Sequence, residues 1–257
     1  MRPFILMHGP LVGPFTWVPV AAELRRRGAA VVVPGVTSPG FKPGTFWEHH
    51  RDEFALELTD VELDSGQALL VGHSDAGPLL PQLGPSLATG PAAYVLVDSD
   101  IPRDGASRFD LFENDDHVER FRRAAVEPYS PRGRLAPQPA RGTEISQGTL
   151  REWPEDLLHE ALTEVADTMV DVQSTVFAGK RPTPVNTFEE PIPVPASWPE
   201  APCAFMHLSK TYAPAAAEAK SRGWLVREVP SSHVQMLLDP EGFAQELASV
   251  AEELLGG

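Results

Sequence analysis

The sequence predicts an α/β fold, a mostly parallel sheet of about six strands flanked by helices, with one helical cap inserted into it. Short continuous apolar runs alternate with stretches of helical spacing up to residue 100, and the alternation resumes at residue 202. Between these halves the alternation is lost. We therefore expect one core domain, residues 1–100 and 202–257, and one cap, residues 101–201.

Four strands are expected in the first half of the core, because each is a short apolar run that ends at a turn signal. Continuous apolar runs are typical of strands that are buried on both faces, so the sheet is expected to be parallel. The four runs are residues 3–8, 29–33, 68–71 and 93–97, and the helical stretches between them are 17–27, 45–62 and 78–88.

The cap and the second half of the core follow the same reasoning. Charged stretches with helical spacing at 108–126 and 154–177 are separated by loops that contain proline and glycine. Residues 182–202 are rich in proline, so no regular element is expected there. In the second half, the expected strands are 203–208 and 224–229, and the expected helices are 213–222 and 241–254.

Composition excludes several classes of function. The chain has 257 residues, with 21 Lys and Arg against 36 Asp and Glu, so its formal charge is 21 − 36 = −15. Such a surface repels nucleic acids and anionic membranes, and neither is expected as a partner. Cys203 is the single cysteine, and the first residues lack the pattern of a signal peptide, so the cytoplasm is the expected location.

The segment Gly72-His73-Ser74-Asp75-Ala76 has the pattern of a nucleophile turn. It follows an expected strand and precedes an expected helix, which is the context that exposes a serine at the edge of a sheet. Such a sharp turn needs small residues two positions before and two positions after the serine, and Gly72 and Ala76 satisfy this. Ser74 is therefore the candidate nucleophile.

Several motifs together resemble the α/β-hydrolase superfamily, and the resemblance covers nearly the whole chain. They are His8-Gly9 after the first strand, Trp17, the Gly-His-Ser turn, the cap insertion, and a late His233 followed by Asp239-Pro240. The resemblance implies a fold without the two N-terminal strands common in the superfamily. It also implies a serine esterase or thioesterase, similar to hydrolases of bacterial natural-product pathways, that uses no cofactor or metal.

The resemblance assigns the base and offers two positions for the acid. His233 lies after the last strand, where relatives place the histidine that takes the serine proton. In many relatives the acid follows the strand before the last, but residues 203–217 contain no Asp or Glu. Other relatives carry it after the strand that follows the nucleophile helix, where this chain has Asp98 and Asp100. Asp98 is the first candidate, Asp100 is the second, and a dyad without an acid stays open.

The expected oxyanion hole departs from the superfamily pattern. One donor is the backbone N–H of Asp75, and the other normally comes from the residue after His-Gly. That residue is Pro10, which has no N–H. The second donor is then Leu11 or a side chain, or it is missing, and the loss of one donor costs a factor of about 10² to 10³ in rate.

The function expected from these residues is cleavage of an ester or thioester by way of an acyl group on Ser74. The acyl substrate is a small molecule, free or bound to a carrier protein. One alternative is an acyltransferase of secondary metabolism that passes the acyl group to an alcohol or amine. A second alternative is a ligand-binding or lyase-like use of the fold, in which Ser74 forms no covalent intermediate.

Two histidine-containing clusters look like metal sites at first sight, at residues 49–53 and 114–117. Adjacent residues on a helix point about 100° apart, so neither cluster presents three ligands on one face. Both are expected to be solvated helix faces.

Overall fold

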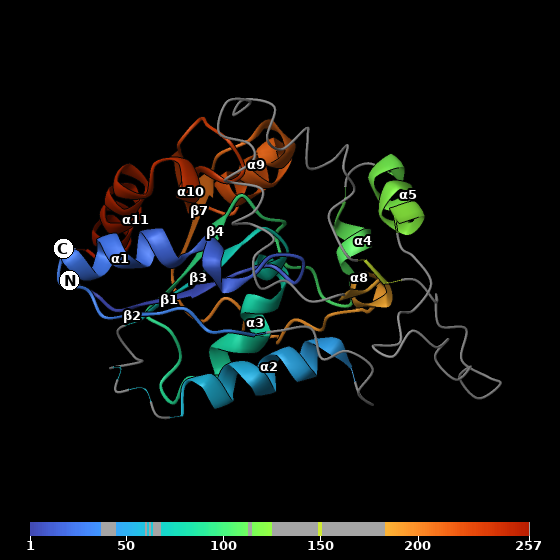
Figure 1. Ribbon diagram of the computed structural model, residues 1–257, viewed down its shortest axis with the longest axis horizontal. Coiled ribbons are helices and arrows are strands. Elements are labelled where there is room, and N and C mark those ends of the chain that lie inside the picture. Colours follow the sequence, from blue (N-terminus) through green and yellow to red (C-terminus); the bar gives the residue numbers. More distant parts are fainter. Residues whose placement is uncertain are drawn as a thin grey trace.

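The computed structural model describes residues 1–36, 45–59, 61, 63, 68–112, 115–124, 149–150 and 183–256. Six strands form one sheet in the order β2-β1-β3-β4-β7-β8, and every pair of neighbours is parallel (Figure 1). The strands are β1 (Phe4–Met7), β2 (Val31–Val32), β3 (Leu69–His73), β4 (Ala93–Val97), β7 (Cys203–His207) and β8 (Leu225–Glu228). The predicted parallel sheet is confirmed.

Helices cover both faces of the sheet, which explains why its strands are apolar throughout. Figure 1 shows α1 and α11 together on one side and α2 and α3 on the other. Side chains of β1 alternate accordingly, since Phe4 and Leu6 pack in the core below α1 and α11, whereas Ile5 and Met7 pack in the core below α2, α3 and α9. These helices are α1 (Val18–Arg26), α2 (Phe46–Glu57), α3 (Leu80–Leu83), α9 (Ala213–Ser221), α10 (Gln235–Leu238) and α11 (Pro240–Leu254).

Proline shortens the helix that was expected at 78–88. Only α3 is α-helical there, between the 3-10 turns Ser74–Leu79 and Gly84–Ser86. Pro78, Pro81 and Pro85 each lack the N–H that a longer helix would require.

The cap segments also differ from expectation. The stretch 108–126 is divided into α4 (Arg108–Leu111) and α5 (Asp115–Ala124). Residues 182–202, for which no regular element was expected, contain the short strand β6 (Thr183–Pro184) and one turn of helix, α8 (Asn186–Glu189). β6 pairs with β5 (Thr149–Leu150) in an antiparallel ladder. The helix expected at 154–177 lies outside the described residues.

The described cap elements share an aromatic core. α4, α5 and α8 gather at one end of the sheet (Figure 1). Their buried side chains pack against Leu11, which lies in the loop after β1. That loop follows the carboxyl end of its strand, so these elements lie at the end of the strands where the candidate catalytic residues were expected. The cap residues of this core are Phe109, Val118, Phe121, Val185 and Phe188.

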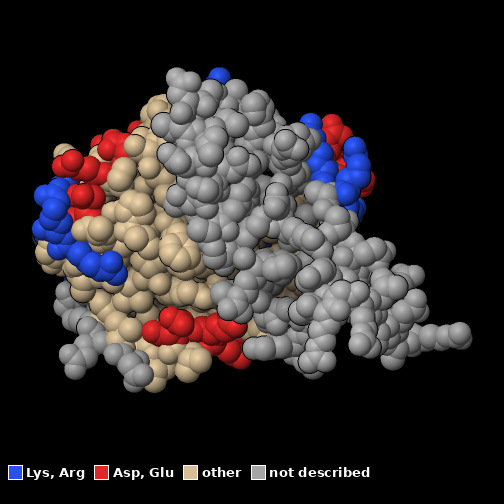
Figure 2. Space-filling model, in the orientation of Figure 1, with Lys and Arg blue, Asp and Glu red and all other residues tan. Residues whose placement is uncertain are grey.

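The surface agrees with the acidic composition. In Figure 2, acidic side chains gather along the lower edge, where Figure 1 places α2. α2 carries the acidic residues Glu48, Asp52, Glu53 and Glu57. Among the described helices, none combines the length and apolar character needed to cross a bilayer.

Candidate active site

Ser74 sits in a tight turn between β3 and the 3-10 turn that follows it. Its backbone φ is +55°, a left-handed value that residues other than glycine rarely adopt. The packing leaves no room for relaxation: a methyl group on Gly72 would lie 2.9 Å from Leu80, and one on Gly77 would overlap the Ser99 hydroxyl. Ser99 Oγ also donates to the Ser74 carbonyl at 2.7 Å. The turn is therefore held by its neighbours in the strained geometry expected of a nucleophile turn.

His233 and Asp98 form a buried pair beside this turn. Nδ1 of His233 lies 2.8 Å from Oδ2 of Asp98, and the two side chains are 4% and 0% exposed. The other oxygen of Asp98 accepts the backbone N–H groups of Leu208 and Ser209 at 2.9 and 3.0 Å, and the Ser209 hydroxyl donates to Oδ2 at 2.6 Å. Burial alone would raise the pKa of Asp98, but the hydrogen bonds and the charge of His233 outweigh it and lower that pKa. The carboxylate is thus ionised and aimed at the imidazole.

This arrangement explains the missing acid after the strand before the last. That position holds Ser209, which donates to Asp98 through both its N–H and its hydroxyl. Asp98 follows the neighbouring strand β4 with a left-handed φ of +43°, and its carboxylate reaches the backbone that follows β7. Of the two aspartates left open by the sequence, the structure brings Asp98 to the imidazole.

His73 supports the loop that carries His233. Nε2 of His73 donates to the backbone carbonyl of His233 at 2.8 Å, and the two ring centroids are 4.4 Å apart. Burial, followed by the nearby charge of His233, lowers the pKa of His73 to about 3. The ring is therefore neutral and serves as a fixed donor.

Tyr212 is a member of the site that the sequence did not indicate. Its ring stacks on the His233 imidazole, with centroids 5.4 Å apart and planes 16° from parallel. Its hydroxyl faces the side chain of Ser74, whose influence lowers the pKa of Tyr212 and partly offsets the effect of burial. No motif marks this position, because Tyr212 reaches the site only through the turn Lys210–Tyr212 after β7.

The loop expected to complete the oxyanion hole is a turn from Gly9 to Val12. The Val12 N–H donates to the Gly9 carbonyl at 3.3 Å, and the Pro10 carbonyl accepts the Thr183 hydroxyl of the cap at 3.2 Å. In the part of the chain that the structure describes, no backbone carbonyl accepts the Leu11 N–H. The Leu11 N–H could therefore serve as a donor to a substrate, and its role as the second oxyanion donor stays a prediction.

A buried arginine of the cap holds the other predicted donor, Asp75. Arg108 is 1% exposed; its Nε donates to the Asp75 carbonyl at 3.2 Å, and its Nη1 donates to the Thr187 carbonyl at 2.9 Å. Burial raises the pKa of the Asp75 carboxyl, and the Arg108 charge opposes that rise. Arg108 therefore links the cap to the nucleophile turn, a role that its position in a charged stretch did not reveal.

In the histidine cluster at residues 49–53, the prediction of a solvated helix face is wrong for His50. His50 is buried with Phe54 on the inner face of α2, and burial, then the charge of Arg108, lowers its pKa to about 3. The two residues are four apart, so they lie on the same face of the helix. No group of three metal-ligating side chains occurs among the described residues.

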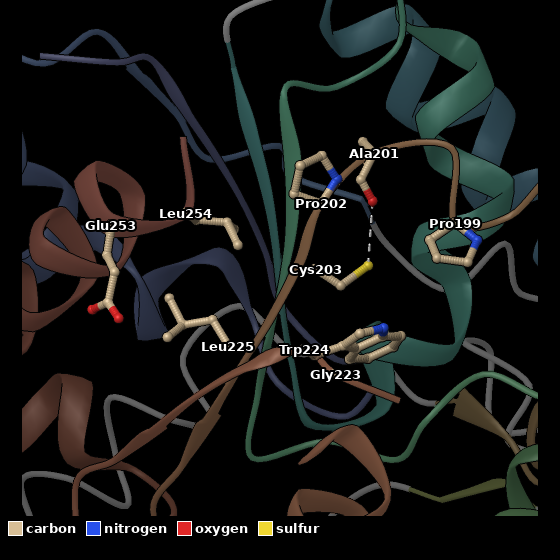
Figure 3. A pocket seen from close by; sticks show the side chains of 9 residues that line it. All are labelled: Pro199, Ala201, Pro202, Cys203, Gly223, Trp224, Leu225, Glu253 and Leu254. Carbon is tan, nitrogen blue, oxygen red and sulfur yellow. Dashed lines mark hydrogen bonds between the residues drawn. The ribbon is translucent and has the colours of Figure 1, made fainter. Parts of the chain in front are cut away.

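A hollow of about 520 Å³ lies far from these residues, where β7 and β8 begin (Figure 3). Cys203, the first residue of β7, lines it, and its thiol donates to the Ala201 carbonyl at 3.6 Å. Burial raises the pKa of Cys203 to about 12, so the thiol is not a nucleophile at neutral pH. Ser74 follows the carboxyl end of β3, whereas this hollow lies at the amino ends of β7 and β8. The hollow and the candidate site are therefore at opposite ends of the parallel strands.

Comparison with known proteins decides the family. The model of the "Alpha/beta hydrolase family" matches residues 4–246. The chain belongs to this family. The predicted superfamily is thus confirmed, and a hydrolase fold accounts for both the sheet and the turn at Ser74. No curated protein sequence matches the chain.

Solved structures of the same fold cover almost the full chain. An extracellular α/β-hydrolase from a Paenibacillus species, described as structurally and functionally homologous to tobacco salicylic acid binding protein 2, is 18% identical, with a TM-score of 0.73 and coverage of 97% of this chain and 99% of its own. A methylesterase from Arabidopsis is 14% identical, with a TM-score of 0.68 and coverage of 99% and 100%. Tomato methylketone synthase I, solved with β-ketoheptanoate, is 16% identical, with a TM-score of 0.68 and coverage of 98% of both chains. At these identities the likeness shows the fold alone.

Proposed function

We propose that the chain is a serine-dependent hydrolase that cleaves an ester or thioester through an acyl-enzyme on Ser74. The observation that carries the proposal is the buried Asp98–His233 pair, 2.8 Å apart, beside a serine held in a strained turn. A serine hydroxyl is a poor nucleophile at neutral pH without such a base. The family and the esterase named among its structural neighbours support the same class of reaction.

Each residue of the proposed site has one task. His233 removes the proton from Ser74 as its oxygen attacks the carbonyl, and then gives that proton to the leaving group. Asp98 fixes the tautomer of His233 and stabilises its cation. The N–H groups of Asp75 and Leu11 bind the oxyanion. Water then hydrolyses the acyl-enzyme by the same steps.

Acyl transfer is the second candidate, and Pro10 is the observation that favours it. If Leu11 does not donate in place of Pro10, the oxyanion has one backbone donor only, and hydrolysis is slow. An acyl-enzyme that water attacks slowly has time to meet an alcohol or an amine.

Mass spectrometry of the products separates these two functions. The purified protein is incubated with an aryl ester or acyl thioester, with and without an alcohol or amine acceptor. Free acid as the main product in both cases supports hydrolysis, whereas an acyl adduct that forms at the expense of the acid supports transfer. Substrate turnover that survives in Ser74→Ala contradicts both.

The proposal also covers substrate and location. We take the acyl substrate to be a small molecule, free or carrier-bound, and the site of action to be the cytoplasm. The formal charge of −15 supports the exclusion of nucleic acids and anionic membranes as partners. A single, buried cysteine is compatible with a reducing compartment.

Replacement of Pro10 tests the second oxyanion donor. If a main-chain donor is missing from this loop, Pro10→Ala supplies an N–H and should raise kcat/KM for an aryl ester about tenfold, which is about 1.4 kcal/mol of transition-state stabilisation. Steady-state kinetics of the wild type and the variant measure it. An unchanged or lower rate would mean that Leu11 already donates, and it would remove the argument for acyl transfer.

A further inference from the structure

Tyr212 contacts both side chains that react in the proposed mechanism. Its ring covers the His233 imidazole, and its hydroxyl faces the side chain of Ser74. The proposed mechanism gives it no task. A hydroxyl beside both of these side chains can donate a hydrogen bond to an atom of the substrate as it reacts.

The position of Tyr212 is fixed by the residues that hold Asp98. Ser209 is bound to Asp98 through its N–H and its hydroxyl, and the Tyr212 N–H donates to the Ser209 carbonyl at 3.2 Å. Helix α9 begins at the next residue, Ala213. The turn that carries the tyrosine is therefore built on the same carboxylate that orients His233.

The stacking shows beside which group of the site the tyrosine ring lies. The oxyanion forms on the side of the Asp75 N–H, at the start of the turn after the nucleophile. The imidazole lies on another side of the serine oxygen, because it must reach both that oxygen and the leaving group. The Tyr212 ring is nearly parallel to the imidazole and in contact with it, so it lies on the imidazole side of the serine, the side from which a phenol can reach the departing oxygen.

We propose that Tyr212 is a further catalytic residue, which donates a hydrogen bond to the oxygen of the departing alcohol and so suits the site to alkyl esters. This inference rests on the proposed function. When the tetrahedral intermediate collapses, the bond between carbon and the alcohol oxygen breaks, and its electron pair stays on that oxygen. The proton from Nε2 of His233 joins the same oxygen, while Tyr212 keeps its own proton and stabilises the charge that develops there.

The surroundings keep the tyrosine in the form that this role requires. Burial, together with the carboxylates of Asp100 and Asp75, raises the pKa of Tyr212 well above its usual value. The hydroxyl is therefore protonated at any working pH and can act as a donor. A thioester gains less from it, because sulfur is a weak acceptor of hydrogen bonds.

Tyr212→Phe, assayed with two esters of the same acid, tests this role. An alkyl alcohol is a poor leaving group and depends on help at its oxygen, whereas p-nitrophenolate leaves without it. We expect kcat/KM to fall about a hundredfold for the ethyl ester and about threefold or less for the p-nitrophenyl ester. Circular dichroism and thermal unfolding check that the variant is folded.

Tyr94→Phe is the matched control. The substitution likewise removes a tyrosine hydroxyl that makes a hydrogen bond, since Tyr94 donates to Glu200 at 2.6 Å. Tyr94 lies near the start of β4, away from Ser74. Both esters should be cleaved at the wild-type rate. Equal losses for the two esters in Tyr212→Phe would place the hydroxyl on the oxyanion, and no loss for either would leave it without a role; either result overturns the inference. A wild-type protein that cleaves neither these esters nor the thioester of the same acid, and in which a fluorophosphonate leaves Ser74 unlabelled, refutes the proposed function itself.

Discussion

Asp98→Asn is expected to lower the rate of acyl-enzyme formation by about 10⁴. The asparagine oxygen can still accept the N–H groups of Leu208 and Ser209, so the loop keeps its position. Its amide NH₂ then faces Nδ1 of His233, where a carboxylate oxygen now lies at 2.8 Å. The imidazole must take the tautomer that carries its proton on Nε2, and in that form it cannot accept the proton of Ser74.

Asp100→Asn is the matched control, because it makes the same chemical change two residues away. We expect a change in rate of about threefold or less, because Asp98 holds the imidazole whereas the charge of Asp100 acts on Tyr212. Stopped-flow measurement of the first turnover of an aryl ester gives both rates. A large loss in Asp100→Asn alone, or none in Asp98→Asn, would show that the acid has been assigned to the wrong residue.

Arg108→Met should lower the free energy of unfolding by about 3 kcal/mol or more. The substitution preserves much of the volume but removes the buried charge that faces Asp75 and Glu190. It also removes the donors to the carbonyls of Asp75 and Thr187. A buried polar group that loses its hydrogen-bond partner destabilises the fold by more than the hydrogen bond had stabilised it, because the group stays desolvated. The loss should shrink as the pH falls, because the Asp75 carboxyl, whose pKa is already raised by burial, then becomes neutral.

Arg122→Met provides the comparison from the same cap. Arg108 lies over the ring of Phe188, and Arg122 similarly lies over that of Phe109. Arg122 also pairs with Glu189 at 3.3 Å, but its side chain is 49% exposed. Exposed pairs contribute little, so a loss of about 0.5 kcal/mol or less is expected. Urea denaturation followed by fluorescence measures both variants. Equal losses would mean that Arg108 is not the link between the cap and the nucleophile turn.

The fold could be predicted because its signals are local. The four residues of β1 are buried on both faces, so the strand is apolar throughout and recognisable without its neighbours. Ser74 could be identified for the same reason, since strand, turn and nucleophile are contiguous. The predicted helices with wrong bounds were those in which an otherwise periodic stretch is interrupted, either by proline or by a break such as the one after Leu111.

The rest of the site depends on contacts between distant segments. Asp98 and His233 are 135 residues apart, and the pairing of β4 with β7 decides which aspartate reaches the imidazole. The resemblance to relatives therefore ranked Asp98 above Asp100 but left both open. Tyr212 and Arg108 enter the site through a turn and a cap helix whose positions no local pattern specifies.

Covalent labelling of Ser74 is the most direct test of the central claim. The wild-type protein is treated with a fluorophosphonate probe, digested, and analysed by mass spectrometry. We predict one modified peptide, with the probe on Ser74, no labelling in Ser74→Ala, and strongly slowed labelling in His233→Ala. A wild-type protein that takes up no probe, or a Ser74→Ala variant that is still labelled at the wild-type rate, would contradict the claim that Ser74 is the nucleophile.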